Sequence, residues 1–331
     1  MAEYRQDLVT GDWVINAPER ARRPHDIRKG MAKRVVVPKE GCPFEDLKKT
    51  GNWPPMISMP NEAKWEVVVI PNKYPAVTHG MKCAVRNVVG PYETRSGIGA
   101  HDVVVLKDHN CPYADLAPGK AVDVLRVIRE RYRTLAEDSC FSYAIGFHNW
   151  GPSAGASLYH PHFQILALPV IPNEARRSLS GSHLYVKEHN QCAHCAMLTY
   201  EKRHKSRIVC QNKEAIAICP FASRKKFEIR IFPKTHIPNF EDSGDKVLIG
   251  VAEVLQKTLK MVRKSLHDPD LNFYIHGAPL KNKEDHSHYH WHIEVMPNVP
   301  PPEAGFELGT GVEINMIDPD FAAALLRGRK K

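Results

Sequence analysis

The second half of this 331-residue chain repeats the pattern of the first half. Residues 160–169 align with residues 288–297, an offset of 128 residues from His160 to His288. Upstream, residues 102–109 align with residues 227–236, and both read as strands that end at a histidine. A match of this length at a nearly constant offset favours an internal duplication over strands that share a composition by chance.

Each half combines strands with one long helix. Residues 119–137 and 246–266 carry apolar side chains at helical spacing. Residues 141–147 and 271–277 are rich in aromatic and β-branched residues, which is typical of strands. Because a single helix divides the strands of each half, we expect antiparallel sheets with one helix packed on a face of each. The chain is therefore predicted to be an α+β protein.

The length agrees with two such units. We expect half-domains at residues 1–172 and 173–331, with residues 171–200 as the connection and residues 321–327 as a short final helix. No run approaches the ~18 apolar residues of a membrane span. The first residues lack the layout of a signal peptide. We therefore expect a cytoplasmic protein without membrane contact, whose eight cysteines stay reduced.

The net charge of +9 indicates what the chain could attract. Basic clusters lie at residues 20–23, 224–226 and 327–331. They are either solvated side chains or sites that attract phosphate groups. Aromatic residues do not alternate with these clusters, as they would in a stacking platform, so nucleic acid is an unlikely partner.

Two groups of residues have the composition of metal sites. The first group is Cys42, Glu45, His109 and His160, and the second is Cys192, Cys195, His236 and His290. Four such ligands suit tetrahedral Zn²⁺, which would contribute folding free energy. The Cys-x-x-Cys pair makes the second site the stronger prediction, although the repeat also offers His288 as its ligand. Glu45 stands where a second cysteine is expected, so it could equally be a solvated acid.

If a metal holds His160, then His162 remains available for chemistry. Side chains two residues apart in a strand share a face, so Gln164 lies beside His162. A neutral imidazole attacks phosphorus well when a hydrogen bond holds its other nitrogen. The amide of Gln164 can donate to a phosphoryl oxygen without supplying a proton, which suits transfer between phosphates. The Gly-rich residues 151–157 offer backbone N–H groups to an anion.

These residues resemble the galactose-1-phosphate uridylyltransferases, a family of the histidine-triad superfamily. Residues 149–164 match the family's Asn-x-Gly-small-small loop followed by His-Pro-His-x-Gln. Further segments that resemble the family cover nearly the whole chain, at residues 10–24, 69–75, 276–279, 290–294 and 305–315.

The resemblance implies a ping-pong reaction of galactose metabolism. His162 would attack the α-phosphorus of UDP-glucose, release glucose 1-phosphate and pass the uridylyl group to galactose 1-phosphate. The implied phosphate contacts are Asn149, Ser157 and Gln164; the implied nucleotide contacts are Arg20, Arg23 and Asn72; and the implied sugar contacts are Phe306 and Glu307. The two arginines would reach a partner subunit in a homodimer.

The chain departs from the family in two places, and other functions remain open. Glu45 replaces a cysteine often found in the first zinc site. His276 and His292 match an iron site of some members, but Glu294 stands where a histidine would be, so the Cys-x-x-Cys favours the zinc version. Shorter members include enzymes that use ADP-glucose and inorganic phosphate, which makes a phosphorylase or adenylyltransferase for ADP-glucose or dinucleoside polyphosphates the second hypothesis. A zinc-stabilised nucleotide- or nucleic-acid-binding protein without turnover is the third.

Overall fold

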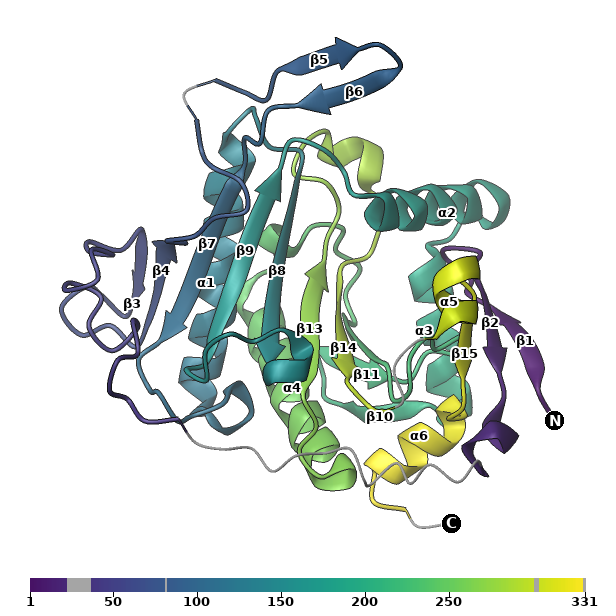
Figure 1. Cartoon of the computed structure of the whole chain (residues 1–331). Helices are drawn as coiled ribbons and strands as arrows, with labels where there is room; N and C mark the ends of the chain where they lie inside the picture. Colours follow the sequence, from purple (N-terminus) through teal and green to yellow (C-terminus); the bar gives the residue numbers. More distant parts are fainter. Residues whose placement is uncertain (23–36, 81, 301–303, 330–331) are drawn as a thin grey trace.

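The computed structural model describes residues 1–22, 37–80, 82–300 and 304–329. Within these residues, ten strands form one sheet that spans both halves of the chain (Figure 1). The first half supplies β3 (Ile57–Met59), β4 (Val67–Pro71), β7 (Ala100–Leu106), β8 (Tyr143–Trp150) and β9 (His162–Leu168). The second half supplies β10 (Ile208–Gln211), β11 (Ala215–Ile218), β12 (Ile229–Pro233), β13 (Leu271–His276) and β14 (His292–Pro297).

Both halves use the same strand order. From the outer edge to the centre it is β3-β4-β7-β9-β8 in the first half and β10-β11-β12-β14-β13 in the second. The neighbouring strands are antiparallel, and the halves join where Asn149 of β8 lies opposite Asn272 of β13. The α+β prediction is confirmed, and the two predicted sheets form one continuous sheet. The shared strand order is what a duplication predicts.

The last strands of the two halves align two residues away from the predicted offset. β9 begins at His162 and β14 begins at His292, so His160 in the first half is equivalent to His290 in the second half, and not to His288. A shift of two residues leaves every side chain of a strand on the same face. The hydrophobic pattern therefore could not distinguish the two alignments.

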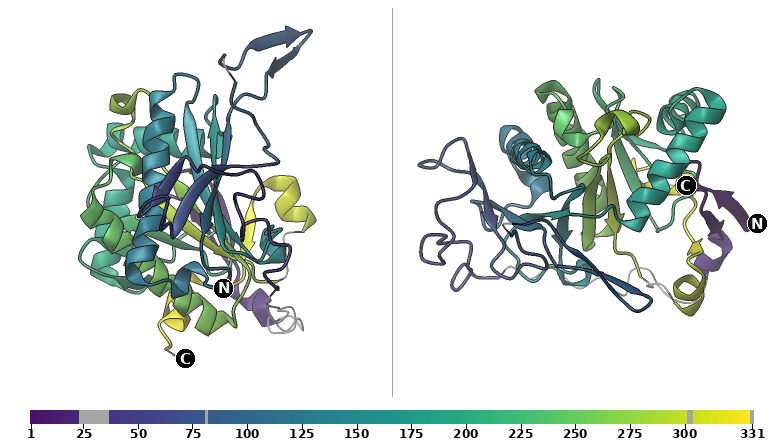
Figure 2. Two further views of the ribbon diagram at one scale, coloured as in Figure 1. Left: turned by 90° about the vertical axis from the view of Figure 1, so that its left-hand side faces the viewer. Right: turned by 90° about the horizontal axis from the view of Figure 1, so that it is seen from above.

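Two long helices cover one face of this sheet (Figure 2). They are α1 (Pro118–Glu137) and α4 (Asp245–Leu266), each within one residue of its predicted start. Proline at the first position of α1 fits a helix start, because that N–H has no partner within the helix. The buried faces include Val124 and Ile128 in α1 and Val251 and Leu255 in α4, which pack on the sheet as the main core.

Shorter elements complete the fold. Two helices connect the halves, α2 (Asn173–His189) and α3 (Ala193–His204). Near the chain ends, β1 (Glu3–Gln6), β2 (Trp13–Asn16) and β15 (Glu313–Asn315) form a second sheet beside α5 (Gly305–Thr310) and α6 (Pro319–Leu326). The hairpin of β5 (Arg86–Val89) and β6 (Tyr92–Arg95) projects from the body (Figure 1). The described helices include none that is long and apolar enough to cross a membrane.

The prediction that all cysteines stay reduced is wrong for one pair. Cys83 and Cys140 form a disulfide that joins the segment before β5 to the segment between α1 and β8. They are 57 residues apart in the sequence, so the fold alone brings them together. The remaining cysteines are free, and Cys210 and Cys219 are the buried ones among them.

Candidate active site and metal centres

The structure brings together all four residues of the first predicted metal group. The possible ligand atoms of Cys42, Glu45, His109 and His160 lie within 4.8 Å of one another. His109 Nδ1 is 2.9 Å from a carboxylate oxygen of Glu45 and 3.2 Å from His160 Nδ1. Cys42 Sγ is 3.5 Å from His160 Nδ1. Glu45 thus occupies the position of a ligand.

Backbone carbonyls fix the tautomers of the two histidines in this group. His109 Nε2 is 3.0 Å from the carbonyl oxygen of Val37, and His160 Nε2 is 2.6 Å from that of Leu106. A carbonyl oxygen can only accept, so each Nε2 donates its proton and each Nδ1 directs a lone pair into the group. Two lone pairs at 3.2 Å, with a carboxylate beside them, repel one another unless a cation lies between them. These four residues therefore fit a bound metal ion, and backbone contacts orient its two histidine ligands.

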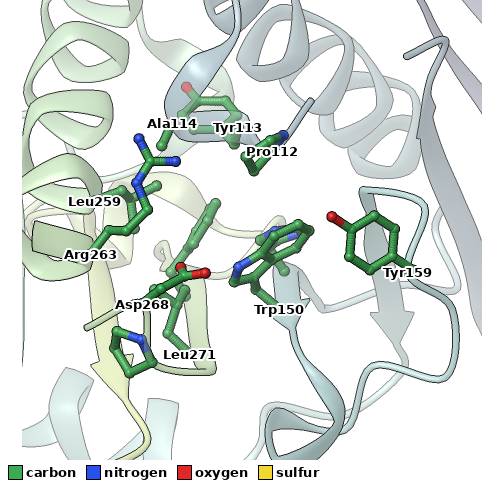
Figure 3. A pocket seen from close by; sticks show the side chains of 12 residues that line it. Pro112, Tyr113, Ala114, Trp150, Tyr159, Leu259, Arg263, Asp268 and Leu271 are labelled. Atoms are coloured by element: carbon green, nitrogen blue, oxygen red, sulfur yellow. The ribbon is translucent and has the colours of Figure 1, made fainter. Parts of the chain in front are cut away.

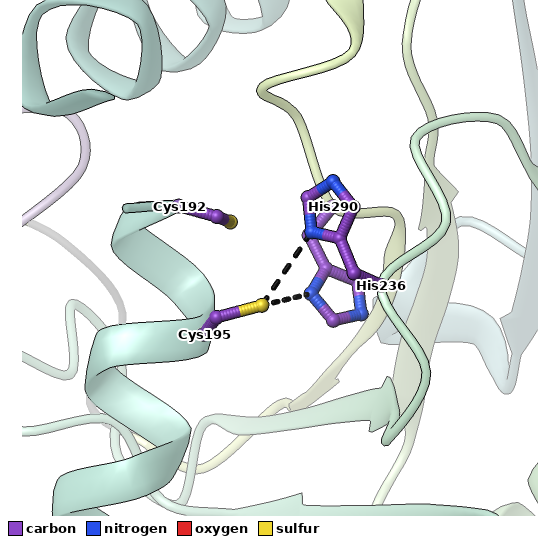
Figure 4. A group of neighbouring side chains, drawn as sticks. All are labelled: Cys192, Cys195, His236 and His290. Carbon is purple, nitrogen blue, oxygen red and sulfur yellow. Dashed lines mark hydrogen bonds between the residues drawn. The ribbon is translucent and has the colours of Figure 1, made fainter. Parts of the chain in front are cut away.

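The second group has the same construction (Figure 4). Cys192 and Cys195 come from the start of α3, and His236 and His290 face them. Cys195 Sγ is 3.4 Å from His236 Nδ1 and 3.6 Å from His290 Nδ1. The Nε2 atoms of His236 and His290 donate to the carbonyls of Ser287 and Pro233. This donor set fits tetrahedral zinc.

Two further observations bear on the second group. Hydrogen bonds from Cys195 and the neighbouring histidines lower the pKa of the Cys192 thiol, whereas the same contact with Cys192 raises the pKa of Cys195, so one thiol of the pair readily forms the thiolate that metals bind. His288, the alternative ligand, lies outside the group, because its Nε2 is 3.1 Å from the carbonyl of Leu179. Of the two histidines that the sequence left open, the structure therefore places His290 among the cysteines.

His162 is arranged as a neutral nucleophile. Its Nδ1 donates to the carbonyl of His160 at 2.8 Å, so Nε2 carries the lone pair. Burial lowers the pKa of this imidazole and keeps it uncharged at neutral pH. Phe44 packs edge-on against His162, with 5.2 Å between the ring centroids. His148 donates from Nδ1 to the carbonyl of His162 at 2.7 Å and so holds this end of β9.

Two of the predicted phosphate contacts, Gln164 and Asn149, share a sheet face with His162. Gln164 lies two residues along β9, opposite Phe147 of β8, and Asn149 follows on the same face of β8. Asn149 Oδ1 accepts from Asn272 Nδ2 at 2.8 Å, so the Nδ2 of Asn149 remains a donor. Ser157 is exposed on the loop between β8 and β9.

Glycine is required where this loop leaves β8. Gly151 has a φ of +93°, which L-residues rarely adopt, and a Cβ there would lie 1.8 Å from a carboxylate oxygen of Asp270. The loop continues through the short 3₁₀ turn Pro152–Ala154. Any larger residue at 151 would strain the loop and displace the Asp270 carboxylate, which accepts from the backbone N–H of Ser153 in the same loop.

Sequence reasoning missed His101, the second residue of β7. Its Nε2 is 2.9 Å from Gln164 Oε1 and 3.0 Å from Asn72 Nδ2. It therefore lies between a predicted phosphate contact and a predicted nucleotide contact. No motif marks this histidine, and its position became visible through the register of β7 against β9.

Other predicted residues lie elsewhere. Arg20 is exposed in the 3₁₀ turn Pro18–Arg22, and Arg23 lies outside the described residues. Phe306 and Glu307 belong to α5, which lies well apart from β9 in both views (Figures 1 and 2). Glu307 accepts from the backbone N–H of Ala304 and caps its own helix. Among the described residues, no contact joins Arg20, Phe306 or Glu307 to His162, and the roles of these three and of Arg23 stay predictions.

An aromatic cavity of about 250 Å³ lies on the other face of the sheet (Figure 3). His148 and Trp150 line it together with Tyr113 and Arg263. Alternate residues of β8 point to opposite faces, so His148 and Trp150 point away from Asn149. This cavity is therefore separate from the surface that carries Gln164.

The second half holds a closed counterpart of the site. His292 corresponds to His162, and its Nδ1 donates to the carbonyl of His290 at 3.2 Å. Glu294 takes the place of Gln164 and binds Arg224 at 2.8 Å and Arg230 at 3.1 Å. Burial lowers the pKa of His292 to about 3, and the side chain is almost inaccessible. Burial alone would raise the pKa of Glu294, but the two arginines outweigh it and hold that pKa well below its usual value.

Comparisons with known proteins agree with this geometry. Residues 1–172 match the family model described as galactose-1-phosphate uridyl transferase, N-terminal domain. The chain is 32% identical to ADP-glucose phosphorylase of Arabidopsis thaliana over 98% of this chain and 92% of the relative. It is 27% identical to galactose-1-phosphate uridylyltransferase of Thermotoga maritima over 99% and 98%.

Two solved structures share the fold over nearly the whole chain. An ADP-glucose phosphorylase from Arabidopsis thaliana with bound ADP-glucose matches with a TM-score of 0.84 and 30% identity over 100% of both chains. A uridylyltransferase structure matches with a TM-score of 0.76 and 28% identity over 99% of this chain and 98% of that one.

Proposed function

Because the chain belongs to the galactose-1-phosphate uridylyltransferase family, we propose that it transfers a nucleotidyl group from a nucleoside diphosphate hexose to a phosphate acceptor. One observation carries the proposal. His162 is buried and neutral, with Nδ1 bound to a carbonyl and Nε2 presenting its lone pair beside Gln164. That arrangement suits attack on phosphorus better than it suits packing.

The proposed reaction has two displacements. His162 Nε2 bonds to the α-phosphorus, the bond from that phosphorus to the bridging oxygen breaks, and hexose 1-phosphate leaves with both bonding electrons. An oxygen of the acceptor phosphate then attacks the same phosphorus and releases Nε2. The leaving group is already an ionised phosphate, so it needs no proton. Gln164 would donate to a non-bridging oxygen and stabilise the charge.

For the substrates, we propose ADP-glucose with inorganic phosphate as the first pair to test. Its support is the greater similarity to the Arabidopsis phosphorylase, at 32% identity, than to the Thermotoga uridylyltransferase, at 27%. The pair of UDP-glucose and galactose 1-phosphate is the second candidate, because several relatives carry that name. Both pairs use the same two displacements at His162. A binding protein without turnover would not need this imidazole.

We propose Zn²⁺ at both metal groups, with a structural role. The first group holds the ring of His160, whose carbonyl accepts from His162 Nδ1. Metal binding would thereby fix the orientation of the nucleophile without touching the substrate. The homodimer, with Arg20 and Arg23 near the partner's nucleotide, and the cytoplasmic location stay predictions.

A covalent adduct tests the function directly. The protein is incubated with ADP-glucose and separately with UDP-glucose, and its intact mass is measured. We expect a gain of one nucleoside monophosphate with the true donor, and no gain in His162→Ala. His189→Ala, at an exposed histidine of α2, is the matched control and should form the adduct normally. No adduct and no hexose 1-phosphate exchange with either donor would refute the proposal.

A further inference from the structure

We propose that His101 is a positioning residue, which fixes the amide of Gln164 so that its NH₂ group faces the phosphoryl group being transferred. The inference rests on the function proposed above and assigns a task to a histidine outside the motif. His101 and Gln164 lie diagonally across strands β7 and β9, on one face of the sheet, because Val103 is directly opposite Gln164. The contact between them is 2.9 Å long.

A backbone donor determines which nitrogen of His101 carries the proton. The N–H of Ala76 donates to His101 Nδ1 at 3.0 Å. The hydrogen of a backbone amide cannot be reassigned, so Nδ1 must be the acceptor. In the neutral ring the proton is then on Nε2, which makes Nε2 a donor.

The single Nε2 proton has one acceptor within reach among the two amides beside it. Asn72 Oδ1 already accepts from the N–H of Tyr74 at 2.9 Å. This contact leaves the Asn72 amide with Nδ2 toward His101 Nε2; both atoms are donors, so that 3.0 Å contact is not a hydrogen bond. Gln164 Oε1 is therefore the atom that accepts from His101.

This hydrogen bond decides what Gln164 presents to an anion. With Oε1 bound to His101, the NH₂ group is the polar end that remains for a phosphoryl oxygen. A reversed amide would direct its oxygen toward the phosphate and repel it. An unsupported glutamine populates both orientations, so the imidazole converts a variable donor into a fixed one, and preorganised donors stabilise developing charge most effectively.

The main chain holds His101 rigidly for this task. Its carbonyl accepts from the N–H of Asn72 at 2.9 Å, and the following residue, Asp102, pairs with Pro71 of β4 and Ile165 of β9. The ring is thus fixed from the strand on one side and from the N–H of Ala76 on the other.

A double-mutant cycle tests the proposal with the full-length enzyme. We expect His101→Ala to lower kcat of nucleotidyl transfer roughly 10- to 100-fold with little change in KM, less than the cost of about 100- to 1000-fold for removing such a donor, because the Gln164 amide remains but is no longer oriented. If His101 acts through Gln164, then the double variant His101→Ala/Gln164→Ala should be no slower than Gln164→Ala. Multiplied effects in the double variant, or a change in KM alone, would overturn the proposal.

Conservative variants separate positioning from folding. His101→Gln can place an amide nitrogen near the position of imidazole Nε2 and should recover most of kcat. His101→Asn, whose amide reaches only the position of Nδ1, should stay as slow as His101→Ala. His79→Ala removes another contact of the same region, the 2.8 Å bond to Asp138, and should leave kcat unchanged. Equal rates for His101→Gln and His101→Ala would overturn the proposal.

A spectroscopic readout is independent of turnover. Imidazole ¹⁵N spectra, assigned by their difference from His101→Asn, should show His101 as the Nε2–H tautomer, and the Nδ1–H tautomer would overturn the proposal. A wild-type enzyme that transfers no nucleotide with either donor refutes the proposed function, and this inference falls with it. An active wild type with an equally active His101→Ala overturns this inference alone.

Discussion

Removal of one cysteine should show how much the second metal group contributes to stability. Cys192→Ser replaces the thiol with a hydroxyl of similar shape that binds zinc poorly. The group connects the start of α3 with the segments that carry His236 and His290, and Cys195 and His236 are 41 residues apart in the chain. If the bound metal acts as a cross-link, closing a loop of this length contributes about 4 kcal/mol to the free energy of unfolding.

The loss of the metal also leaves an electrostatic cost. The Nδ1 lone pairs of His236 and His290 both point at the cysteine sulfurs, because their Nε2 atoms are bound to carbonyls. We therefore expect Cys192→Ser to lower the free energy of unfolding by at least ~4 kcal/mol.

Two measurements check this prediction. Elemental analysis should find about one zinc ion fewer per chain in Cys192→Ser, and urea unfolding should show the reduced free energy of unfolding. Cys111→Ser is the matched control, since Cys111 is a half-buried free cysteine that belongs to neither metal group. It should keep its zinc and unfold nearly as the wild type does. An unchanged zinc content in Cys192→Ser would refute the second site.

The remaining predictions concern the amide beside the nucleophile and a buried ion pair. Gln164→His should shorten the lifetime of the nucleotidyl adduct in water, because an imidazole at this position can supply a proton to His162 Nε2 as it leaves the phosphorus. An adduct lifetime that is unchanged, as measured by intact mass, would contradict the argument. Asp7→Asn should lower the free energy of unfolding by about 2 kcal/mol at neutral pH, since it removes one charged, hydrogen-bonded partner of the buried Arg230, at 3.1 Å, while Glu228 and Glu294 remain. Burial raises the pKa of Asp7, but Arg230 and the backbone N–H groups of Thr10 and Val9 together outweigh it and lower that pKa, so the wild-type advantage is present above the usual pKa of an aspartate and disappears as the pH falls through the lowered value. A difference in the free energy of unfolding between the wild type and Asp7→Asn that stays constant as the pH falls into the acid range would contradict this prediction.

The sequence predicted the elements that have a strong local pattern. The long helices α1 and α4 were correct within one residue at their starts, because their apolar positions repeat at helical spacing. Both metal groups came together as predicted, since the two halves share one strand order and carry their ligands at corresponding places. The sequence did not predict features that depend on the register of a strand. The repeat could not distinguish His288 from His290, because they share a strand face.

The sequence also did not predict contacts between segments that are far apart in the chain. The Cys83–Cys140 disulfide depends on how the projecting hairpin leaves the sheet, and no spacing rule encodes that. His101 is an ordinary strand histidine until β7 is placed beside β9. Its function in the site follows from cross-strand contacts with Gln164 and Asn72, which have no counterpart in any local motif.

The two halves show how one scaffold supports two outcomes. In both halves, a second histidine lies two residues after a histidine of the metal group. Its Nδ1 donates to the carbonyl of that metal-group histidine, at 2.8 Å for His162 and 3.2 Å for His292. In the first half the next residue on that face is a neutral amide that can donate to a phosphate. In the second half it is Glu294, which would repel a phosphate and is itself neutralised by Arg224 and Arg230. The backbone geometry of a reactive histidine is thus present twice, and in the second half the burial of His292 and the carboxylate of Glu294 both keep an anion away from it.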